Sequence, residues 1–153
     1  MIGTPKFCAD AIAKWRSGGG RHQIYTLSYV PAGLLTKVVG EAGARGVGIA
    51  QTFPSPQGSK LKLQREFQQT MQQYAPNIKD YSYFHLEGYV SARVLVAGLR
   101  RAGARPTAST LRAALKDMGE ISVGGFNVDF RKGNVGSTWV DIAVVSEGGR
   151  LRY

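Results

Sequence analysis

The sequence predicts an α/β fold with Rossmann-like parallel-sheet elements, and three observations support this prediction. Strand and helix patterns alternate as β-α-β-α-β over the first third of the chain, the order that builds a parallel sheet with short crossovers. Three helical patterns follow, and two or three strand patterns complete the chain. Apolar residues make up 43% of the 153 residues, enough for a packed core, so intrinsic disorder is not expected.

The first third is expected to open with the end of a strand at Met1–Thr4. A helix should follow to about Arg16, because Thr4 suits the N-cap and Pro5 suits the first helical position. The next expected elements are a strand at Gln23–Leu27, a helix at Pro31–Val39, a glycine-rich turn at Gly40–Gly46 and a strand at Gly46–Phe53.

The longest helical pattern in the chain is Ser82–Gly103. Its apolar residues fall at helical spacing, Ser82 suits the N-cap, and Gly103 is a typical stop. Small residues in this helix would let a neighbouring element approach closely: Gly88, Ala92, Ala97 and Gly98. The other expected elements are a stiff Pro54–Pro56 connector, helices at Ser59–Tyr74 and Ala108–Met118, strands at Val123–Phe130 and Ser137–Val145, and a final segment at Arg150–Tyr153.

The chain is strongly basic, with 20 Lys and Arg against 10 Asp and Glu and a net charge of +10. Such a charge raises the question of a nucleic-acid or polyanion partner. The basic residues are scattered, however, and their longest runs are the pairs Arg100–Arg101 and Arg131–Lys132. A solvated positive surface is therefore favoured and no nucleic acid is expected, while a small basic α/β domain that binds a polyanion stays the alternative.

Residues that would carry catalysis or bind a metal are scarce. The single cysteine, Cys8, permits no intrachain disulfide, and with His22 and His85 it makes no metal cluster. The segment Gly40–Gly46 lacks the Lys-Ser/Thr ending of a phosphate loop, and no nucleophile elbow is present. We therefore expect a protein that is not an enzyme and needs no cofactor. No apolar run is long enough to span a membrane, and the first ten residues lack the pattern of a signal peptide.

The remaining candidate is a small-molecule site at the carboxyl ends of strands, where open α/β sheets bind ligands. Two such ends carry hydroxyls close to helix starts. Thr4 and Pro5 follow the first strand, and Ser28 and Tyr29 follow the second. Two alternatives stay open, since Ser28 would also serve as a cap for the helix at Pro31 and Tyr29 would also serve in ordinary packing.

Several blocks of this sequence resemble the C-terminal part of the type I periplasmic ligand-binding proteins, which are the substrate-binding proteins of ABC transporters for branched-chain amino acids and related molecules. The resemblance covers nearly the whole chain and keeps the order of the blocks, with His85 where the family usually has Ser. The blocks are IGTPKFCADAIAKWRSGG, LSYV, QTFPSP, HLEGYVSARVLVAGLRRAG, TLRAALKDM, VGGFNVDF, GSTWVDIAVV and EGGRL.

The resemblance implies an incomplete two-lobed fold, in which two α/β lobes are joined by three crossovers and clamp a ligand between them. By analogy, residues 1–52 are the late part of lobe two, residues 53–130 are the late part of lobe one, and residues 131–153 return to lobe two. The N-terminal part of lobe one is expected to be absent. The implied location of the full-length protein is the periplasm, and its implied partners are ABC permease subunits.

The resemblance also implies a ligand and a set of binding residues. Thr4, Pro5, Ser28 and Tyr29 are the expected contacts for an amino-acid-like ligand or a small carboxylate or amide. Ser28 falls where amino-acid-binding members place an acidic residue for the ligand ammonium, and a serine carries no such charge. Because half of each sheet would be missing, exposed strand edges and apolar faces are expected to drive self-association of the chain.

Overall fold

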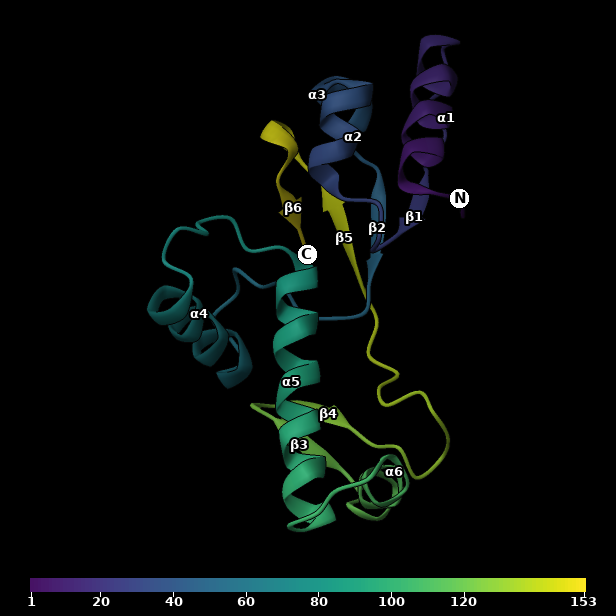
Figure 1. The fold of residues 1–153 in the computed structure, drawn as a ribbon. Coiled ribbons are helices and arrows are strands. Elements are labelled where there is room, and N and C mark those ends of the chain that lie inside the picture. Colours follow the sequence, from purple (N-terminus) through teal and green to yellow (C-terminus); the bar gives the residue numbers. More distant parts are fainter. The chain divides into compact units, whose positions relative to one another are not determined.

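The computed structural model describes all residues from 1 to 153, and they form two compact units (Figure 1). Unit 1 comprises Met1–Thr52 and Val140–Tyr153, and unit 2 comprises Phe53–Trp139. Residues 131–139, which were expected to return to lobe two with the last strands, therefore lie in unit 2. The assignment of these parts to the lobes of a two-lobed protein stays a prediction.

Unit 1 is a four-stranded sheet with helices packed on one face. Its elements are α1 (Pro5–Ser17), β1 (Tyr25–Leu27), α2 (Ala32–Val39), α3 (Glu41–Ala44), β2 (Gly48–Gln51), β5 (Asp141–Val145), η1 (Glu147–Gly149) and β6 (Leu151–Arg152). The strand order is β1-β2-β5-β6, with β1 parallel to β2 and the other two pairs antiparallel. The predicted α/β fold with parallel-sheet elements is confirmed, with β1 and β2 as the parallel pair.

The core of unit 1 forms where helix side chains meet one face of the sheet. Cys8 and Ile12 of α1 and Leu35 of α2 are fully buried with Ile49 of β2 and Val145 of β5. The Cys8 thiol lies 3.5 Å from the carbonyl oxygen of Gly3, to which it donates. Cys8 is therefore a small buried core residue, because a free thiol packs like a small apolar side chain.

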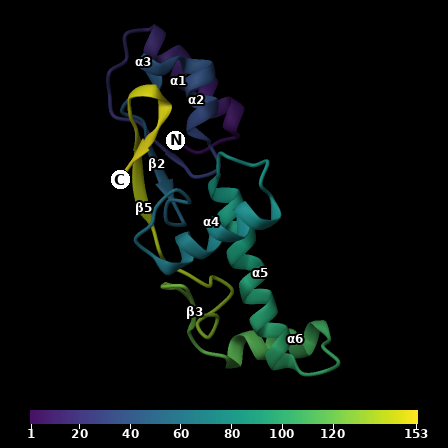
Figure 2. The same ribbon diagram turned by 90° about the vertical axis from the view of Figure 1, so that its left-hand side faces the viewer.

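Unit 2 is built on α5 (Tyr83–Ala102), the long helix that the sequence predicts within one residue at each end. Its other elements are α4 (Lys62–Tyr74), α6 (Ala108–Asp117), β3 (Ile121–Val123) and β4 (Phe126–Val128). Leu86 and Val90 of α5 are buried with Phe67 of α4 and Phe126 of β4. Figure 2 shows α6 at the C-terminal end of α5.

The start of α5 is held by a reciprocal pair of hydrogen bonds. The Ser82 hydroxyl accepts from the His85 backbone N–H at 3.3 Å, and the His85 Nδ1 accepts from the Ser82 backbone N–H at 3.1 Å. Together they satisfy two donors at the start of the helix that no helical carbonyl reaches. His85 thus has a local structural role at the start of α5.

One of the small residues in α5 admits a close neighbour, as predicted. A Cβ at Gly98 would lie 2.7 Å from Leu115 Cδ2 and 2.8 Å from Leu111 Cδ1, so only hydrogen fits between α5 and α6 at this position. Gly88, in contrast, has no such neighbour within 4 Å. The small residues in this helix therefore lie on two different faces, and α6 covers one of them.

Three local predictions are wrong. Val123–Phe130 is not one strand but contains a hairpin, in which Gly124 and Gly125 have φ of +60° and +92° and join β3 to β4. These angles match a type I′ turn, which suits the twist of a two-residue hairpin. The glycine-rich segment Gly40–Gly46 contains the short helix α3. Met1–Thr4 is not a strand, although the Met1 amine donates to the Tyr25 carbonyl oxygen at 2.6 Å.

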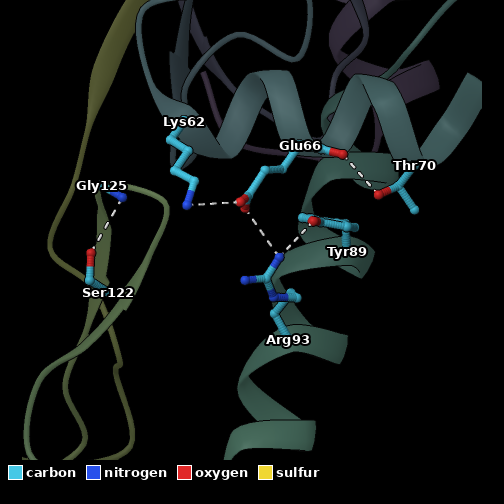
Figure 3. Close-up of polar contacts among 7 residues, drawn as sticks. All are labelled: Lys62, Glu66, Thr70, Tyr89, Arg93, Ser122 and Gly125. Atoms are coloured by element: carbon cyan, nitrogen blue, oxygen red, sulfur yellow. Dashed lines mark hydrogen bonds and ion pairs between the residues drawn. The ribbon is translucent and has the colours of Figure 1, made fainter.

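A polar network links α4 and α5 in unit 2 (Figure 3). Glu66 lies 3.3 Å from the Lys62 ammonium and 3.2 Å from the Arg93 guanidinium, which also donates to Tyr89 Oη at 2.8 Å. Burial raises the pKa of the Glu66 carboxyl, but the two cations outweigh it and the pKa is lowered overall. The network keeps Glu66 charged and fixes the polar side of the contact between the two helices.

None of the helices is long and apolar enough to cross a membrane.

Candidate functional site

The structure brings together the two chain segments in which the sequence predicts ligand contacts. The Gly3 backbone N–H donates to Tyr29 Oη at 3.4 Å, which joins the start of α1 to the turn after β1. Tyr29 is half-buried, and its ring packs against the core of unit 1. The ring therefore has the packing role left open above, while its hydroxyl lies at the predicted site.

Thr4 and Pro5 start helix α1 as predicted. The Thr4 hydroxyl accepts from the Phe7 backbone N–H at 3.3 Å, and Pro5 occupies the first turn, where a missing N–H costs nothing. Thr4 is exposed. A hydroxyl that accepts one hydrogen bond still has its own hydrogen to donate, so Thr4 can contact a ligand without losing its capping role.

Ser28 lies in a tight turn and does not cap the next helix. The Val30 backbone N–H donates to the Leu27 carbonyl oxygen at 3.0 Å and closes this turn. The N-cap position of α2 is Pro31, and no side chain hydrogen-bonds there. The capping alternative for Ser28 is therefore wrong, and its half-buried hydroxyl is free to bind another group.

A further polar residue, Gln51, lies at the same end of the sheet and was not among the predicted contacts. Leu27 of β1 pairs with Ala50 of β2, so Gln51 comes level with Ser28 at the carboxyl ends of the two parallel strands. Gln51 is only 1% exposed, and its Oε1 has no hydrogen-bond partner. A buried acceptor without a partner costs roughly 1–3 kcal/mol. The sequence signal for this residue is a glutamine at the end of an otherwise apolar strand.

These four polar side chains offer hydrogen bonds but no charge. Hydroxyls come from Thr4, Ser28 and Tyr29, and an amide comes from Gln51. Such groups can bind a carboxylate or an amide, whereas a ligand ammonium needs an acceptor charge that none of them has. No group of three or more His, Cys, Asp or Glu side chains in the chain is arranged to hold a metal ion.

Unit 2 has a surface cavity of about 470 Å³, and none of the predicted site residues line it. Phe126 and Trp139 form an apolar wall, and Asp129 and Lys132 contribute charge. Hydrogen bonds from the Arg131 side chain and backbone lower the Asp129 pKa to about 2. This carboxylate is thus already bound by a cation, which leaves it a poor partner for a ligand ammonium.

Comparisons with known proteins agree on one family. A family model described as a periplasmic binding protein matches residues 1–150. An extracellular ligand-binding receptor from Verminephrobacter eiseniae is 45% identical with a TM-score of 0.89, and the match covers 99% of this chain and 43% of that one. A substrate-binding periplasmic protein from Ralstonia solanacearum is 35% identical with a TM-score of 0.78, over 90% of this chain and 40% of that one.

A third structure, a possible leucine/isoleucine/valine-binding protein from Rhodopirellula baltica SH 1, is 26% identical with a TM-score of 0.87, over 100% of this chain and 42% of that one. A comparison with curated proteins found no match. The coverages show that the chain spans less than half the length of these three solved proteins. Because the family model covers almost every residue and the fold agrees, the chain belongs to the type I periplasmic binding protein family.

Proposed function

We propose that this chain is part of a solute-binding component of an ABC importer, and that its carboxyl-end cluster of Thr4, Pro5, Ser28 and Tyr29 contacts the solute. The observation that supports this most directly is the Gly3–Tyr29 hydrogen bond, which holds two segments of distant sequence at the same end of the sheet. Open α/β sheets bind ligands at this end. Gln51 is the further polar group we add to the cluster.

The ligand class we propose is a small carboxylate or amide. The cluster supplies neutral hydrogen-bond donors, which suit a carboxylate or an amide. It supplies no acid to pair with an α-ammonium, and an unpaired charge in a partly buried site is costly. A carboxylate without an amino group should therefore bind at least as tightly as the corresponding α-amino acid.

Isothermal titration calorimetry of the 153-residue chain with phenylacetate and with L-leucine tests this proposal. Ser28→Asp introduces the missing charge and should shift the preference towards L-leucine by about 10–100-fold, because a charge-assisted hydrogen bond contributes roughly 1.5–3 kcal/mol. Ser91→Asp on the exposed side of α5 is the matched control and should not change the preference. The proposal fails if neither compound binds at millimolar concentration, or if Ser28→Asp leaves the ratio unchanged.

The wider role follows from the family and is part of the same proposal. Capture of the solute would involve no covalent chemistry, the whole protein would act in the periplasm, and permease subunits would accept the solute from it. The polyanion alternative has a separate test, since heparin binding that falls steeply with salt would support it. Heparin binding without carboxylate binding would replace the solute-binding proposal.

We also propose that the 153-residue chain self-associates. Large apolar side chains are exposed in both units, among them Tyr25 and Ile142 in unit 1 and Phe84 and Leu95 in unit 2. Burial of apolar surface is the main favourable term in association. Size-exclusion chromatography with light scattering should give a mass above 16.5 kDa, and a monomer at 100 µM would contradict the proposal.

A further inference from the structure

Unit 2 has a second cavity, between helix α6 and the loop that follows β4, and we call it the α6 pocket. Its volume is about 320 Å³. Every residue that lines it belongs to Phe53–Trp139, so the pocket lies wholly within unit 2. The loop contributes Gly133 and Asn134, and the other lining residues are Ala108, Leu111, Arg112, Leu115, Lys116 and Phe130.

The contribution of α6 to the pocket follows from its sequence. The lining positions 108, 111, 112, 115 and 116 are three or four residues apart, so they lie on one side of the helix. Leu111 and Leu115 also reach α5, where a Cβ at Gly98 would meet them. Both leucines and Phe130 are half-buried, so part of each side chain remains uncovered at the pocket. The pocket therefore has an apolar side.

Arg112 and Lys116 add two positive charges to the same pocket. Both are exposed, they are four residues apart, and neither is a member of any of the four ion pairs in the chain. No acidic side chain lines the pocket. The acids next to its lining residues in sequence are Asp117 and Asp129, and Arg131 already hydrogen-bonds Asp129. Two unpaired cations beside an apolar surface favour an anion with an apolar body.

The surrounding sequence strengthens this preference for an anion. Residues 88–116 contain six Arg and Lys and no Asp or Glu. Cations that are not interspersed with acids raise the local positive potential, which attracts anions over about 8 Å at physiological ionic strength. A volume of about 320 Å³ lies at the small end of the roughly 300–1,000 Å³ that ligand sites span, so the pocket suits a small molecule and not a polymer.

We propose that the α6 pocket binds a small carboxylate with an apolar body, for which octanoate is the probe. The carboxylate lies at Arg112 and Lys116, and the apolar body lies against the leucines and Phe130. This site is in a different unit from the cluster of the proposed function and does not rest on it. The two sites also differ in chemistry, because the unit 1 cluster offers neutral hydrogen bonds and the α6 pocket offers charge.

Titration of the 153-residue chain with octanoate, followed through backbone amide chemical shifts, tests the proposal. Shifts at Gly133 and Asn134 report on the α6 pocket, and shifts at Gly3 and Ser28 report on the unit 1 cluster. Acetate has the charge without the body and should bind at the pocket at least tenfold more weakly, because each buried CH₂ strengthens binding about fourfold. The alcohol 1-octanol has the body without the charge and should bind at least threefold more weakly.

Variants then test the lining residues themselves. Arg112→Gln combined with Lys116→Gln should weaken octanoate binding at the pocket at least threefold. Lys14→Gln combined with Lys37→Gln removes the same charge from exposed positions of unit 1 and should change this binding by less than twofold. Ala108→Trp, at an exposed lining position, should fill the pocket and abolish the shifts at Gly133 and Asn134. Circular dichroism checks that each variant keeps its helices.

Three results would overturn the inference. Equal binding of 1-octanol and octanoate, or equal losses in the two double variants, would show that the two cations do not hold the carboxylate. Octanoate shifts confined to Gly3 and Ser28 would remove the α6 pocket as a site and assign octanoate to the unit 1 cluster. An absence of shifts at both places would overturn the α6 pocket and count against the proposed carboxylate site as well.

Discussion

Gly124 in the β3–β4 hairpin is a position where one methyl group should measurably destabilise unit 2. Its φ of +60° is one that residues with a side chain rarely adopt. A Cβ there would also lie 2.7 Å from Leu63 Cα and would press on the Leu63 backbone nitrogen. That nitrogen donates to the Gly124 carbonyl oxygen at 2.9 Å, so the clash acts on a hydrogen bond between the hairpin and the start of α4.

The neighbouring glycine supplies a matched control for the size of the effect. Gly125 also has a positive φ, of +92°, but a Cβ there meets only Leu61 Cδ2 at 3.5 Å, an ordinary contact. Gly125→Ala should therefore show backbone strain alone, about 1 kcal/mol. Gly124→Ala adds overpacking against backbone that cannot rotate away, about 1–3 kcal/mol. The two variants should differ by about 2 kcal/mol in the free energy of unfolding.

Urea unfolding followed by Trp139 fluorescence measures this difference. Trp139 packs edge-to-face on Phe126 of β4, with ring centroids 6.4 Å apart, and so reports on the hairpin. Trp15, half-exposed in unit 1, is replaced by phenylalanine so that one tryptophan remains in the chain. The midpoint for Gly124→Ala should fall below that for Gly125→Ala by on the order of 1 M.

Equal losses in the two alanine variants would show that the Leu63 backbone yields at no cost, and the steric argument would then be wrong. An unchanged midpoint in both variants would show that this turn does not need positive φ. Unchanged far-ultraviolet circular dichroism before unfolding would show that each variant keeps its native secondary structure.

Two further predictions concern unit 2. Phe67→Ala should lower the free energy of unfolding by about 3–5 kcal/mol, because Phe67 is fully buried against two tyrosine rings. Phe84→Ala, at a half-exposed position, should lower it by about 1 kcal/mol or less. Equal losses would contradict the core described for unit 2. The Asp129 carboxyl should titrate in a carbon-13 NMR experiment with a pKa of about 2, because Arg131 hydrogen-bonds the charged form. The contribution of this carboxyl to stability is therefore present above its ordinary pKa of 3.8 and is lost as the pH falls through about 2. Arg131→Ala should return the Asp129 pKa towards 3.8, and an unmoved pKa would rule out this pair.

Local sequence signals were sufficient for the longer helices, whereas the four-residue helix α3 was missed. Ser82 and Gly103 delimit α5 because an N-cap hydroxyl and a glycine stop act within one turn of the residue itself. Thr4 and Pro5 specify the start of α1 in the same way. The hairpin in Val123–Phe130 was missed although Gly124 and Gly125, between β-forming residues, are a sequence signal for a two-residue turn.

The candidate site was predicted only in part, for a physical reason. Ser28 could be named because a hydroxyl after a strand is visible in the sequence, whereas Thr4 was named after an expected strand at Met1–Thr4 that the structure does not contain. Gln51 could not be ranked, since its importance comes from full burial and an unpaired Oε1, and burial depends on the neighbouring strands. The capping alternative for Ser28 could be eliminated only when the structure placed Pro31 at the start of α2.

The sequence by itself thus determined the α/β class, the boundaries of α1 and α5 and the family resemblance, because caps, periodicity and ordered blocks are properties of neighbouring residues. Only the tertiary structure decided which distant groups meet, such as Gly3 with Tyr29, and which apolar side chains form a buried core, such as Phe67 and Ile49. Those features depend on contacts between residues far apart in the chain, and periodicity shows that a face is apolar without showing what packs against it.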